Sequence, residues 1–313
     1  MDTTPDTAGP AGPARSADLA GFAGKVVLIT GGGGGIGSAA ARRFTAQGGH
    51  VVLADIDRAR GEAVARETGA LFVRADTAEL ADNERLVRAA VDRFGGLDAV
   101  WLNSGVLAGS AIGDGFDPEA YRRLLAVNVD SVVYGVQAAL PALRARGGGS
   151  ITVTASTTGL RPSPDVFYAA SKHAVVGLVR SLAPALAGDG VTLNVLCPGA
   201  VETPLIAGRL AAWRAAGVAV AAPDLVVDAM AVAVRDGRTG QAWVVAADTG
   251  ITRFEFADLV VAGEGRLRFA DGRVTSTTAG PHDDDGHDAP GDAPGARPGD
   301  PAAAPAAPPA PGR

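Results

Sequence analysis

The segment from Lys25 to Asp55 constrains the fold of this chain more than any other. An apolar run, KVVLIT, is followed at once by the glycine-rich stretch GGGGGIG, a segment of helical composition, and a second apolar run that ends in Asp55. Short runs of aliphatic residues next to glycine predict buried strands. Strand, glycine turn, helix and strand in this order predict a βαβ unit, the setting in which a glycine loop binds a dinucleotide.

The chemistry of a pyrophosphate explains why the loop is made of glycine. Backbone N–H groups at the positive end of a helix bind phosphate, and side chains would hold the phosphate away. We therefore predict cofactor contacts from Gly31, Gly35, Ile36 and Gly37. Asp55 could accept hydrogen bonds from both ribose hydroxyls of NAD and would repel the 2′-phosphate of NADP. A glycine run alone could be a flexible turn, but the flanking strands and the acid favour NAD.

The rest of the folded part alternates between strand and helix patterns, which is typical of a parallel sheet covered on both faces. We predict an α/β fold, a three-layer doubly wound parallel sheet in a single domain. Pro184 should kink or shorten the helix that contains it. Strands are expected near 26–30, 51–55, 70–74, 98–103, 150–155, 191–196 and 242–246, and helices over 36–47, 58–67, 78–94, 118–145, 167–187, 204–215 and 224–235.

Composition shifts at both ends of the chain. Residues 1–20 are rich in Pro, Ala, Gly and Thr and predict a disordered leader, which leaves residues 21–275 for the catalytic domain. Residues 276–313 predict a disordered tail, because nine of the twenty prolines lie between positions 281 and 313. His282 and His287 stand among aspartates there, but a flexible acidic segment lacks the fixed surroundings of a tight metal site. We expect no metal site and no effect on folding or activity when residues 277–313 are deleted.

Charge and cysteine content exclude several classes of protein. The net charge is −6 and the isoelectric point is about 5.3, which argues against a nucleic-acid-binding surface. The single cysteine, Cys197, excludes an internal disulfide framework and fits a reducing compartment. Neither a secretory leader nor an apolar run long enough to span a bilayer is evident. We expect a cytoplasmic protein that contacts neither nucleic acid nor membrane.

Polar residues at strand ends are the next candidates, because ligands of a doubly wound sheet bind outside its carboxyl ends. Asp76 could accept a hydrogen bond from an adenine amino group or could cap the following helix. Asn103 and Gly105 end the fourth strand in WLNSG. A glycine there lets the backbone approach a cofactor, although it could also mark an ordinary turn.

Three further segments supply groups suited to proton transfer. Ser156 ends the strand ITVTAS, and Tyr168 and Lys172 are four apart in YAASK, so they share a helix face. A tyrosine titrates near about 10 and needs nearby positive charge to act as a base at neutral pH. Lys172 and an oxidised nicotinamide would supply that charge, and Ser156 could bind the substrate oxygen. Asn128, in a predicted long helix, could hold a water in a proton path.

These motifs together resemble the short-chain dehydrogenase/reductase family over roughly residues 22–246. TGGGGGIG is similar to the family's TGxxxGxG loop, and WLNSG resembles its NNAG segment. Asn128 falls at the family's helix asparagine, and Ser156, Tyr168 and Lys172 match its serine and YxxxK pair. CPGAVETP resembles the segment that passes the nicotinamide.

The resemblance implies a Rossmann fold and a catalytic tetrad of Asn128, Ser156, Tyr168 and Lys172. Tyr168 would be the acid/base, and Lys172 would hold the nicotinamide ribose and lower the pKa of Tyr168. Homodimers or homotetramers, with helices 118–145 and 167–187 at the interface, are also implied. The same resemblance adds four cofactor contacts: Pro198, Gly199, Val201 and Thr203.

The chain departs from the family pattern at three places. Leu102 and Ser104 replace an Asn and an Ala of NNAG, which could alter how the central strands are tied. The Asp-Gly-Gly close after the last strand is absent, and the region from Thr203 to Pro223 is short. These differences concern the substrate pocket and the C-terminus and leave the tetrad intact.

The favoured hypothesis is an NAD-dependent oxidoreductase that interconverts a secondary alcohol and a ketone. Leu205, Ile206, Leu210 and Trp213 would cover a lipophilic substrate, unless their segment is an amphipathic helix packed on the core. Arg209 and Arg214 could meet an anionic group, although exposed arginines are usual. Two alternatives stay open: an NADP-dependent carbonyl reductase, helped only by Arg58, and a non-catalytic dinucleotide-binding module.

Overall fold

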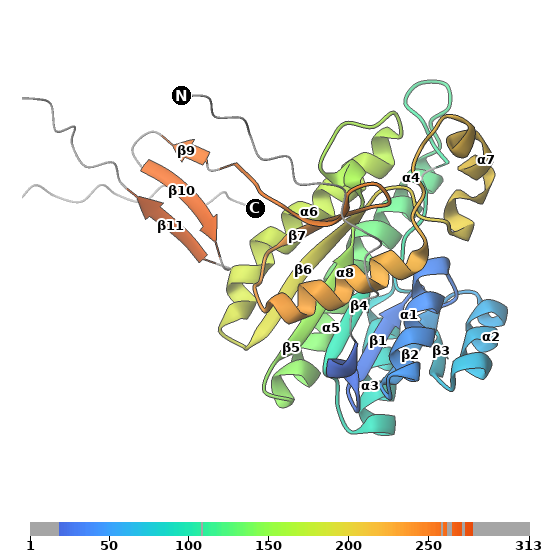
Figure 1. Ribbon diagram of the computed structural model, residues 1–313, viewed down its shortest axis with the longest axis vertical. Helices are drawn as coiled ribbons and strands as arrows, with labels where there is room; N and C mark the ends of the chain where they lie inside the picture. The colour runs from blue at the N-terminus through green and yellow to red at the C-terminus, as the bar shows by residue number, and fades with distance from the viewer. Residues whose placement is uncertain (1–18, 108, 258, 262–264, 271–272, 278–313) are drawn as a thin grey trace, which may run out of the picture.

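A twisted eight-stranded sheet forms the centre of the molecule (Figure 1). The computed structural model describes residues 19–107, 109–257, 259–261, 265–270 and 273–277. The strand order is β3-β2-β1-β4-β5-β6-β7-β8. The pairs from β3 to β7 are parallel, and β8 joins the edge antiparallel. Its strands are β1 (Val26–Thr30), β2 (His50–Asp55), β3 (Leu71–Arg74), β4 (Ala99–Leu102), β5 (Gly149–Thr154), β6 (Val191–Pro198), β7 (Ala242–Ala246) and β8 (Gly250–Phe254).

Helices cover both faces of this sheet, so the fold has three layers: helices, sheet and helices. They are α1 (Gly35–Ala46), α2 (Arg58–Thr68), α3 (Leu80–Phe94), α4 (Pro118–Leu125), α5 (Ser131–Ala145), α6 (Val166–Ala187), α7 (Ala207–Ala215) and α8 (Pro223–Asp236). Short single turns occur at η1 (Ala20–Phe22), η3 (Thr157–Gly159) and η4 (Pro204–Ile206), and a π-helical segment, η2, spans Ala126–Asp130.

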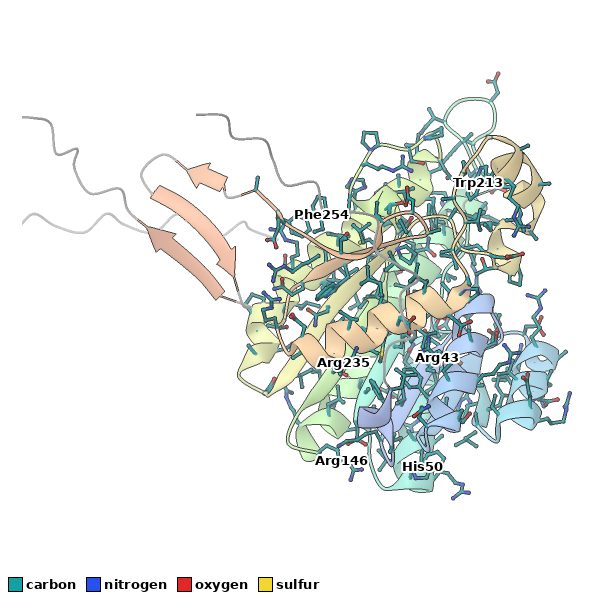
Figure 2. All side chains as sticks on the ribbon, viewed as in Figure 1. Arg43, His50, Arg146, Trp213, Arg235 and Phe254 are labelled. Atoms are coloured by element: carbon teal, nitrogen blue, oxygen red, sulfur yellow. The ribbon has the colours of Figure 1, made fainter. Side chains whose placement is uncertain are left out.

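Two apolar cores lie on the two faces of the sheet, because successive side chains of a strand point to opposite sides. On β1, Val26 and Leu28 pack with α3, α5 and α6, whereas Val27 and Ile29 pack with α1, α2 and α8. A partly buried ion pair joins two helices on the second face: Arg43 of α1, labelled in Figure 2, donates to Asp228 of α8 at 2.7 Å. The predicted three-layer doubly wound α/β fold is confirmed.

The strand order reverses between β1 and β4, and this places the glycine loop at the opening of the sheet. The loop leaves β1 through Gly31, whose φ of 66° favours glycine. A Cβ on Gly37 would overlap the carbonyl oxygen of Gly31, so the first turn of α1 can pack on the loop only with glycine there. The sequence GGGGGIG therefore produces a tight turn rather than a flexible one.

Several expectations about elements need correction. The predicted helix 118–145 is helical throughout but is divided by η2, where the hydrogen-bond pattern widens. Pro184 does not shorten α6, which continues to Ala187, and a kink at this proline stays a prediction. The antiparallel strand β8 was not expected, nor was a second sheet of order β11-β10-β9, built from β9 (Leu259–Val261), β10 (Gly265–Ala270) and β11 (Arg273–Thr277).

The limits of the expected domain stay predictions, with one difference at the C-terminal side. Strand β11 includes Ser276 and Thr277, which the sequence assigned to the tail. Residues 1–18 and 278–313, with His282 and His287, lie outside the described residues.

One helical run, Pro118–Ala145, is long and apolar enough to cross a membrane by length and composition. In this fold it covers the sheet instead, because Val132, Val136 and Leu143 of α5 are buried in the first core. The run is therefore accounted for by packing against α3, β4 and β5.

Candidate active site

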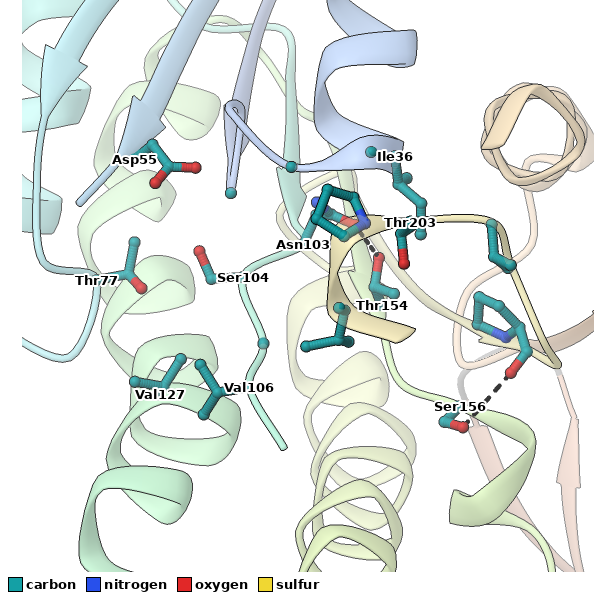
Figure 3. A pocket seen from close by; sticks show the side chains of 18 of the residues that line it. Ile36, Asp55, Thr77, Asn103, Ser104, Val106, Val127, Thr154, Ser156 and Thr203 are labelled. Carbon is teal, nitrogen blue, oxygen red and sulfur yellow. Dashed lines mark hydrogen bonds between the residues drawn. The ribbon is translucent and has the colours of Figure 1, made fainter. Parts of the chain in front are cut away.

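A cleft of about 540 Å³ opens at the carboxyl ends of the central strands (Figure 3). It extends from Asp55 at the end of β2 to Tyr168 on α6. Most residues that the sequence singled out line it: Gly31, Gly35, Ile36, Asp55, Asp76, Asn103, Gly105, Ser156, Tyr168, Lys172, Pro198, Gly199, Val201 and Thr203. Gly37 and Asn128 lie behind its wall, the first in the packing of the loop and the second in a buried hydrogen-bond network.

The start of α1 has the form of an anion-binding site. Its N-cap residue, Gly34, has no side chain to bond the first-turn N–H groups, which have no acceptor within the helix. A Cβ at Gly35 would lie 2.7 Å from Cγ2 of Thr203, so only glycine leaves room between the helix and the opposite wall. Open N–H groups and a narrow cradle of glycine fit the pyrophosphate of a dinucleotide.

Asp55 lies at one end of the cleft with both carboxylate oxygens engaged. Oδ2 accepts from the backbone N–H of Gly33 at 2.9 Å, and Oδ1 accepts from that of Asp57 at 2.9 Å. These two bonds fix the carboxylate beside the glycine loop. A ribose diol bound there would meet a preoriented acceptor.

The end of the cleft near Asp55 also contains an arginine side chain that the sequence analysis did not single out. Arg60 lines the cleft and pairs with Asp57 at 3.2 Å, whereas Arg58 pairs with Glu62 on α2. Arg60 therefore lies beside the loop, and the expectation that Arg58 is the only basic residue near this end of the cleft is wrong. A position one turn into a helix that starts beside the loop is the signal that could have found it.

Asp76 lines the cleft but is held by its own neighbours. Its Oδ1 accepts from the N–H of Ala78 at 3.1 Å, and its Oδ2 pairs with Arg123 of α4 at 2.8 Å. Helix α3 begins later, with Glu79 at the N-cap, so Asp76 caps the preceding turn rather than the helix.

The floor of the cleft ties the ends of three strands together. Asn103 donates from Nδ2 to the carbonyl of Thr30 at 3.2 Å, and its Oδ1 accepts from the Thr154 hydroxyl at 3.0 Å (Figure 3). The hydroxyl of Thr30 accepts from the N–H groups of Asn103 and Ser104 at 2.9 and 3.1 Å. The replacements Leu102 and Ser104 therefore leave β1, β4 and β5 tied through Asn103.

Ser156 and Tyr168 meet at the other end of the cleft. Burial raises the pKa of Tyr168 to about 12, and a hydrogen bond from Ser156 acts in the opposite direction. Asp165 also raises this pKa, and Arg209 lowers it. The Ser156 hydroxyl is also 3.4 Å from the carbonyl oxygen of Pro198, which is long for a hydrogen bond between an O–H donor and an oxygen (Figure 3).

Lys172 is buried beneath the cleft with its ammonium group 3.1 Å from the carbonyl oxygen of Thr154. Burial lowers the pKa of Lys172 to about 8. The thiol of Cys197 on β6 lies in the same region, and burial raises the pKa of Cys197 to about 12. In the protein alone, burial is the largest influence on the pKa of Tyr168, and Lys172 is not among the groups that shift it.

Asn128 links the loop after β4 to helix α6 through hydrogen bonds of its side-chain amide. Its Oδ1 accepts from the N–H of Val106 at 2.9 Å, and its Nδ2 donates to the Val106 carbonyl and the Ser171 hydroxyl, each at 3.0 Å. Ser171 in turn donates to the Tyr168 carbonyl at 2.7 Å. The amide thus connects the cleft floor to the helix turn that carries Tyr168.

The segment from Leu205 to Trp213 lies beside the cleft, and of its residues only Ile206 is buried. Leu205 and Ile206 line the cleft, and α7 has no buried residue, with Trp213 on its surface (Figure 2). Arg209 lies 3.7 Å from Asp165, and Arg214 lies 2.9 Å from Glu202. Of the residues of α7, only Leu210 and Trp213 are partly buried, which is compatible with an amphipathic helix that packs loosely on the molecule. Both arginines are paired with acids of this chain.

Comparison with known proteins supports the same interpretation. A family model described as short chain dehydrogenase matches residues 25–213. The chain belongs to the short-chain dehydrogenase family.

Relatives of this short-chain dehydrogenase act on different alcohols and ketones by name. A cyclohexanol dehydrogenase of Acinetobacter is 38% identical over 192 residues, 59% of this chain and 76% of the relative. An L-fucose dehydrogenase of Bos taurus is 34% identical over 227 residues, 72% of this chain and 82% of the relative. The solved structure of a 3-ketoacyl-(acyl-carrier-protein) reductase from Brucella melitensis, complexed with NADH, matches with a TM-score of 0.68 and 33% identity, covering 72% of this chain and 98% of that one.

This short-chain dehydrogenase is an NAD(P)-dependent oxidoreductase that acts on CH–OH groups. Within the described residues, no group of three or more His, Cys, Asp or Glu side chains could hold a metal ion. The cleft also contains residues that sequence reasoning missed: Arg60, Thr77, Ser104, Arg123 and Thr154. Thr154 could have been found, because it is the last residue of β5 and ligands of a doubly wound sheet bind at the carboxyl ends of its strands.

Proposed function

We propose that this chain is an NAD-dependent dehydrogenase that interconverts a secondary alcohol and a ketone, with Tyr168 as the acid/base. The observation that carries the proposal is the single cleft that joins two kinds of group. Its Asp55 end has a fixed carboxylate beside an open helix start, and its other end combines Ser156, Tyr168 and Lys172.

The preference for NAD over NADP rests on Asp55. Its carboxylate lies where an adenosine ribose would enter beside the glycine loop, and a 2′-phosphate would be repelled there. Arg60 favours the NADP alternative, but it is more than half exposed and already paired with Asp57. A fixed negative charge outweighs an exposed paired cation because solvent screens the latter.

The reaction would proceed by proton transfer at the Tyr168 hydroxyl. When bound, NAD accepts a hydride at nicotinamide C4 and adds a positive charge to the cleft. Tyr168 takes the hydroxyl proton of the alcohol, and Ser156 holds the same oxygen as its charge changes. Lys172 holds the nicotinamide ribose, and its ammonium favours the phenolate form of Tyr168. Val201 and Thr203, opposite the glycine loop, would contact the carboxamide.

We infer that the substrate is uncharged and apolar around its carbinol carbon. Five of the six charged residues that line the cleft, Asp55, Asp57, Arg60, Asp76 and Arg123, lie at its β2–β3 end, and the sixth is the buried Lys172. The end near Tyr168 is bounded by Pro204, Leu205 and Ile206. The relative named for cyclohexanol, a neutral ring alcohol, fits this distribution of charge.

Cofactor binding tests the first half of the proposal. NADH should bind at least tenfold more tightly than NADPH, a difference of about 1.4 kcal/mol. Asp55→Asn should erase that preference, because its amide oxygen can still accept from Gly33 while the charge is gone. Calorimetric titration of both cofactors into both proteins measures this. A preference for NADPH in the unaltered protein would favour the carbonyl reductase alternative.

Substitution of Tyr168 tests the second half and the non-catalytic alternative together. Tyr168→Phe should abolish turnover of secondary alcohols, by about 10³-fold or more, with cofactor binding largely kept. Tyr134→Phe, on α5, is the matched control and should retain activity. If Tyr168→Phe leaves the biological function of the chain unchanged, the dinucleotide-binding module becomes the better description.

We further infer a homodimer or homotetramer located in the cytoplasm. Val133 on α5 is 41% exposed, on one of the two helices that the family resemblance places at an interface. A lone buried thiol fits a reducing compartment. Light scattering after size-exclusion chromatography should give a mass of two or four chains, and Val133→Asp should lower it.

A further inference from the structure

Two tryptophans of the central sheet differ in how their indole N–H groups are satisfied. Trp101 on β4 is fully buried, and its Nε1 donates to the hydroxyl of Thr154 on β5 at 2.9 Å. Trp243 on β7 is 8% exposed, and its Nε1 is buried with no partner among the described residues. The hydrogen bond of Trp101 is therefore a specific feature and not a general property of tryptophan in this sheet.

The bond from Trp101 sets the direction of a chain of hydrogen bonds. An indole N–H can only donate, so the Thr154 hydroxyl must accept from it and has one proton left to give. That proton goes to Oδ1 of Asn103 at 3.0 Å, which leaves Nδ2 of Asn103 to donate to the Thr30 carbonyl. The orientation of the Asn103 amide thus follows from the indole two residues earlier.

Thr154 links this chain to the catalytic centre. Its side chain is held from both sides, by Trp101 and by Asn103, and its own carbonyl oxygen accepts from Nζ of Lys172 at 3.1 Å. Lys172 is 2% exposed, so water can contribute little to its ammonium group. A displacement of the Thr154 backbone would therefore move or weaken the acceptor on which the ammonium depends.

We propose that Trp101 is a positioning residue for Lys172, and that it acts by fixing Thr154 through the indole N–H. Trp101 contacts neither the cleft nor a reacting atom, so its role is indirect. The inference rests on the proposed function for the task of Lys172 at the nicotinamide ribose. The hydrogen-bond geometry on which it stands belongs to the protein without a cofactor.

The sequence makes a direct test possible, because the chain has only two lysines, Lys25 and Lys172. Full-length protein grown with lysine labelled with ¹³C at Cε should give two lysine resonances, which Lys172→Met assigns. The Lys172 resonance should titrate near pH 8, as burial predicts. This measurement requires neither turnover nor bound cofactor.

Trp101→Phe should lower the titration midpoint of Lys172 by about 0.3–1 pH unit, because a less well-held acceptor destabilises the ammonium form. Thr154→Val should do the same, and Thr154→Ser, which restores the hydroxyl, should return the midpoint to that of the unaltered protein. Trp243→Phe is the matched control and should leave it unchanged. The dissociation constant of NADH should rise about two- to tenfold in Trp101→Phe and Thr154→Val only.

An unchanged Lys172 midpoint in Trp101→Phe, or an equal change in Trp243→Phe, would overturn the inference. If Trp101→Phe does not fold, the Thr154→Val and Thr154→Ser pair decides, since both keep the tryptophan. Failure of the proposed function looks different: either the unaltered protein would not turn over secondary alcohols, or Tyr168→Phe would turn them over equally well, whereas the Lys172 midpoint would still respond to Trp101→Phe.

Discussion

At the scale of single residues, the pKa values of Lys172 and Tyr168 are both shifted in the direction that favours the neutral form. Burial lowers the pKa of Lys172 to about 8 and raises that of Tyr168 to about 12. The sequence placed both residues correctly on one helix face, but predicted that Lys172 lowers the pKa of Tyr168. Spacing reports proximity, whereas desolvation depends on everything packed around the pair. A bound nicotinamide would add the charge that the protein alone lacks.

Replacement of Lys172 by methionine should raise stability while it removes activity. The unfolded chain binds a proton at Lys172 up to about pH 10.5, and the folded chain only up to about pH 8. Burial of the charge therefore costs stability in full below pH 8, and that cost disappears as the pH rises to 10.5. Lys172→Met should gain roughly 1–3 kcal/mol at pH 7 and little above pH 10. Urea titrations at both pH values measure this.

If Lys172→Met instead loses stability at pH 7, the hydrogen bond from Lys172 to the Thr154 carbonyl stabilises the fold by more than burial of the ammonium group destabilises it. Lys25→Met provides the control, because Lys25 is a half-exposed partner of Asp98 and should change stability by less than about 1 kcal/mol at either pH.

At the scale of elements, the glycine loop and α1 show how much a motif can specify. The sequence predicted strand, loop, helix and strand with near-correct ends, because each has its own local signal. The cofactor contact of Gly37 stays a prediction, and the structure adds a second role for this glycine, which is to let α1 approach the loop. Residue type identified the position, but only the packing shows which neighbour requires it.

Two glycine-to-alanine changes should have opposite effects on stability. A Cβ on Gly37 would overlap the backbone of Gly31, so Gly37→Ala should cost about 1–3 kcal/mol and weaken cofactor binding. Gly177 lies within α6 with nothing within 4 Å of such a Cβ, so Gly177→Ala should gain about 0.5–1 kcal/mol. Thermal unfolding of both variants tests the pair. A destabilised Gly177→Ala would indicate that this face of α6 is covered by a second chain.

At the scale of the whole molecule, the parallel sheet was predictable and its continuation was not. Alternation of strand and helix patterns predicts strands β1 to β7, since each buried parallel strand is a short aliphatic run. Strand β8 is GITRF, in which Arg253 and Thr252 interrupt the apolar residues, and β9 to β11 have no connecting helix. Such antiparallel strands depend on the edge they pair with, which a local pattern does not reveal. They also lie beyond the residues that the family model matches.

Removal of residues 278–313 should leave the melting temperature and alcohol turnover unchanged, because their composition predicts no packed structure. A cut after Thr277 keeps β11 paired with β10, whereas the boundary first expected from composition would remove Ser276 and Thr277 from that pairing. Calorimetry and a turnover assay on the shortened and full chains measure the effect. A fall of more than a few degrees would contradict the predicted disorder.

Because the thiol of Cys197 is buried in the centre of the sheet, the rate at which it is chemically labelled can measure how often the sheet opens. A thiol-specific reagent must reach the sulfur atom and react with the thiolate form. While β6 stays paired between β5 and β7, the Cys197 thiol is inaccessible, and its raised pKa keeps it protonated. No other cysteine competes for the reagent, so the labelling rate of the unaltered chain measures how often this region separates. Ligands that bind in the neighbouring cleft should lower the labelling rate of Cys197. The factor should equal the one by which they lower the population of the open state.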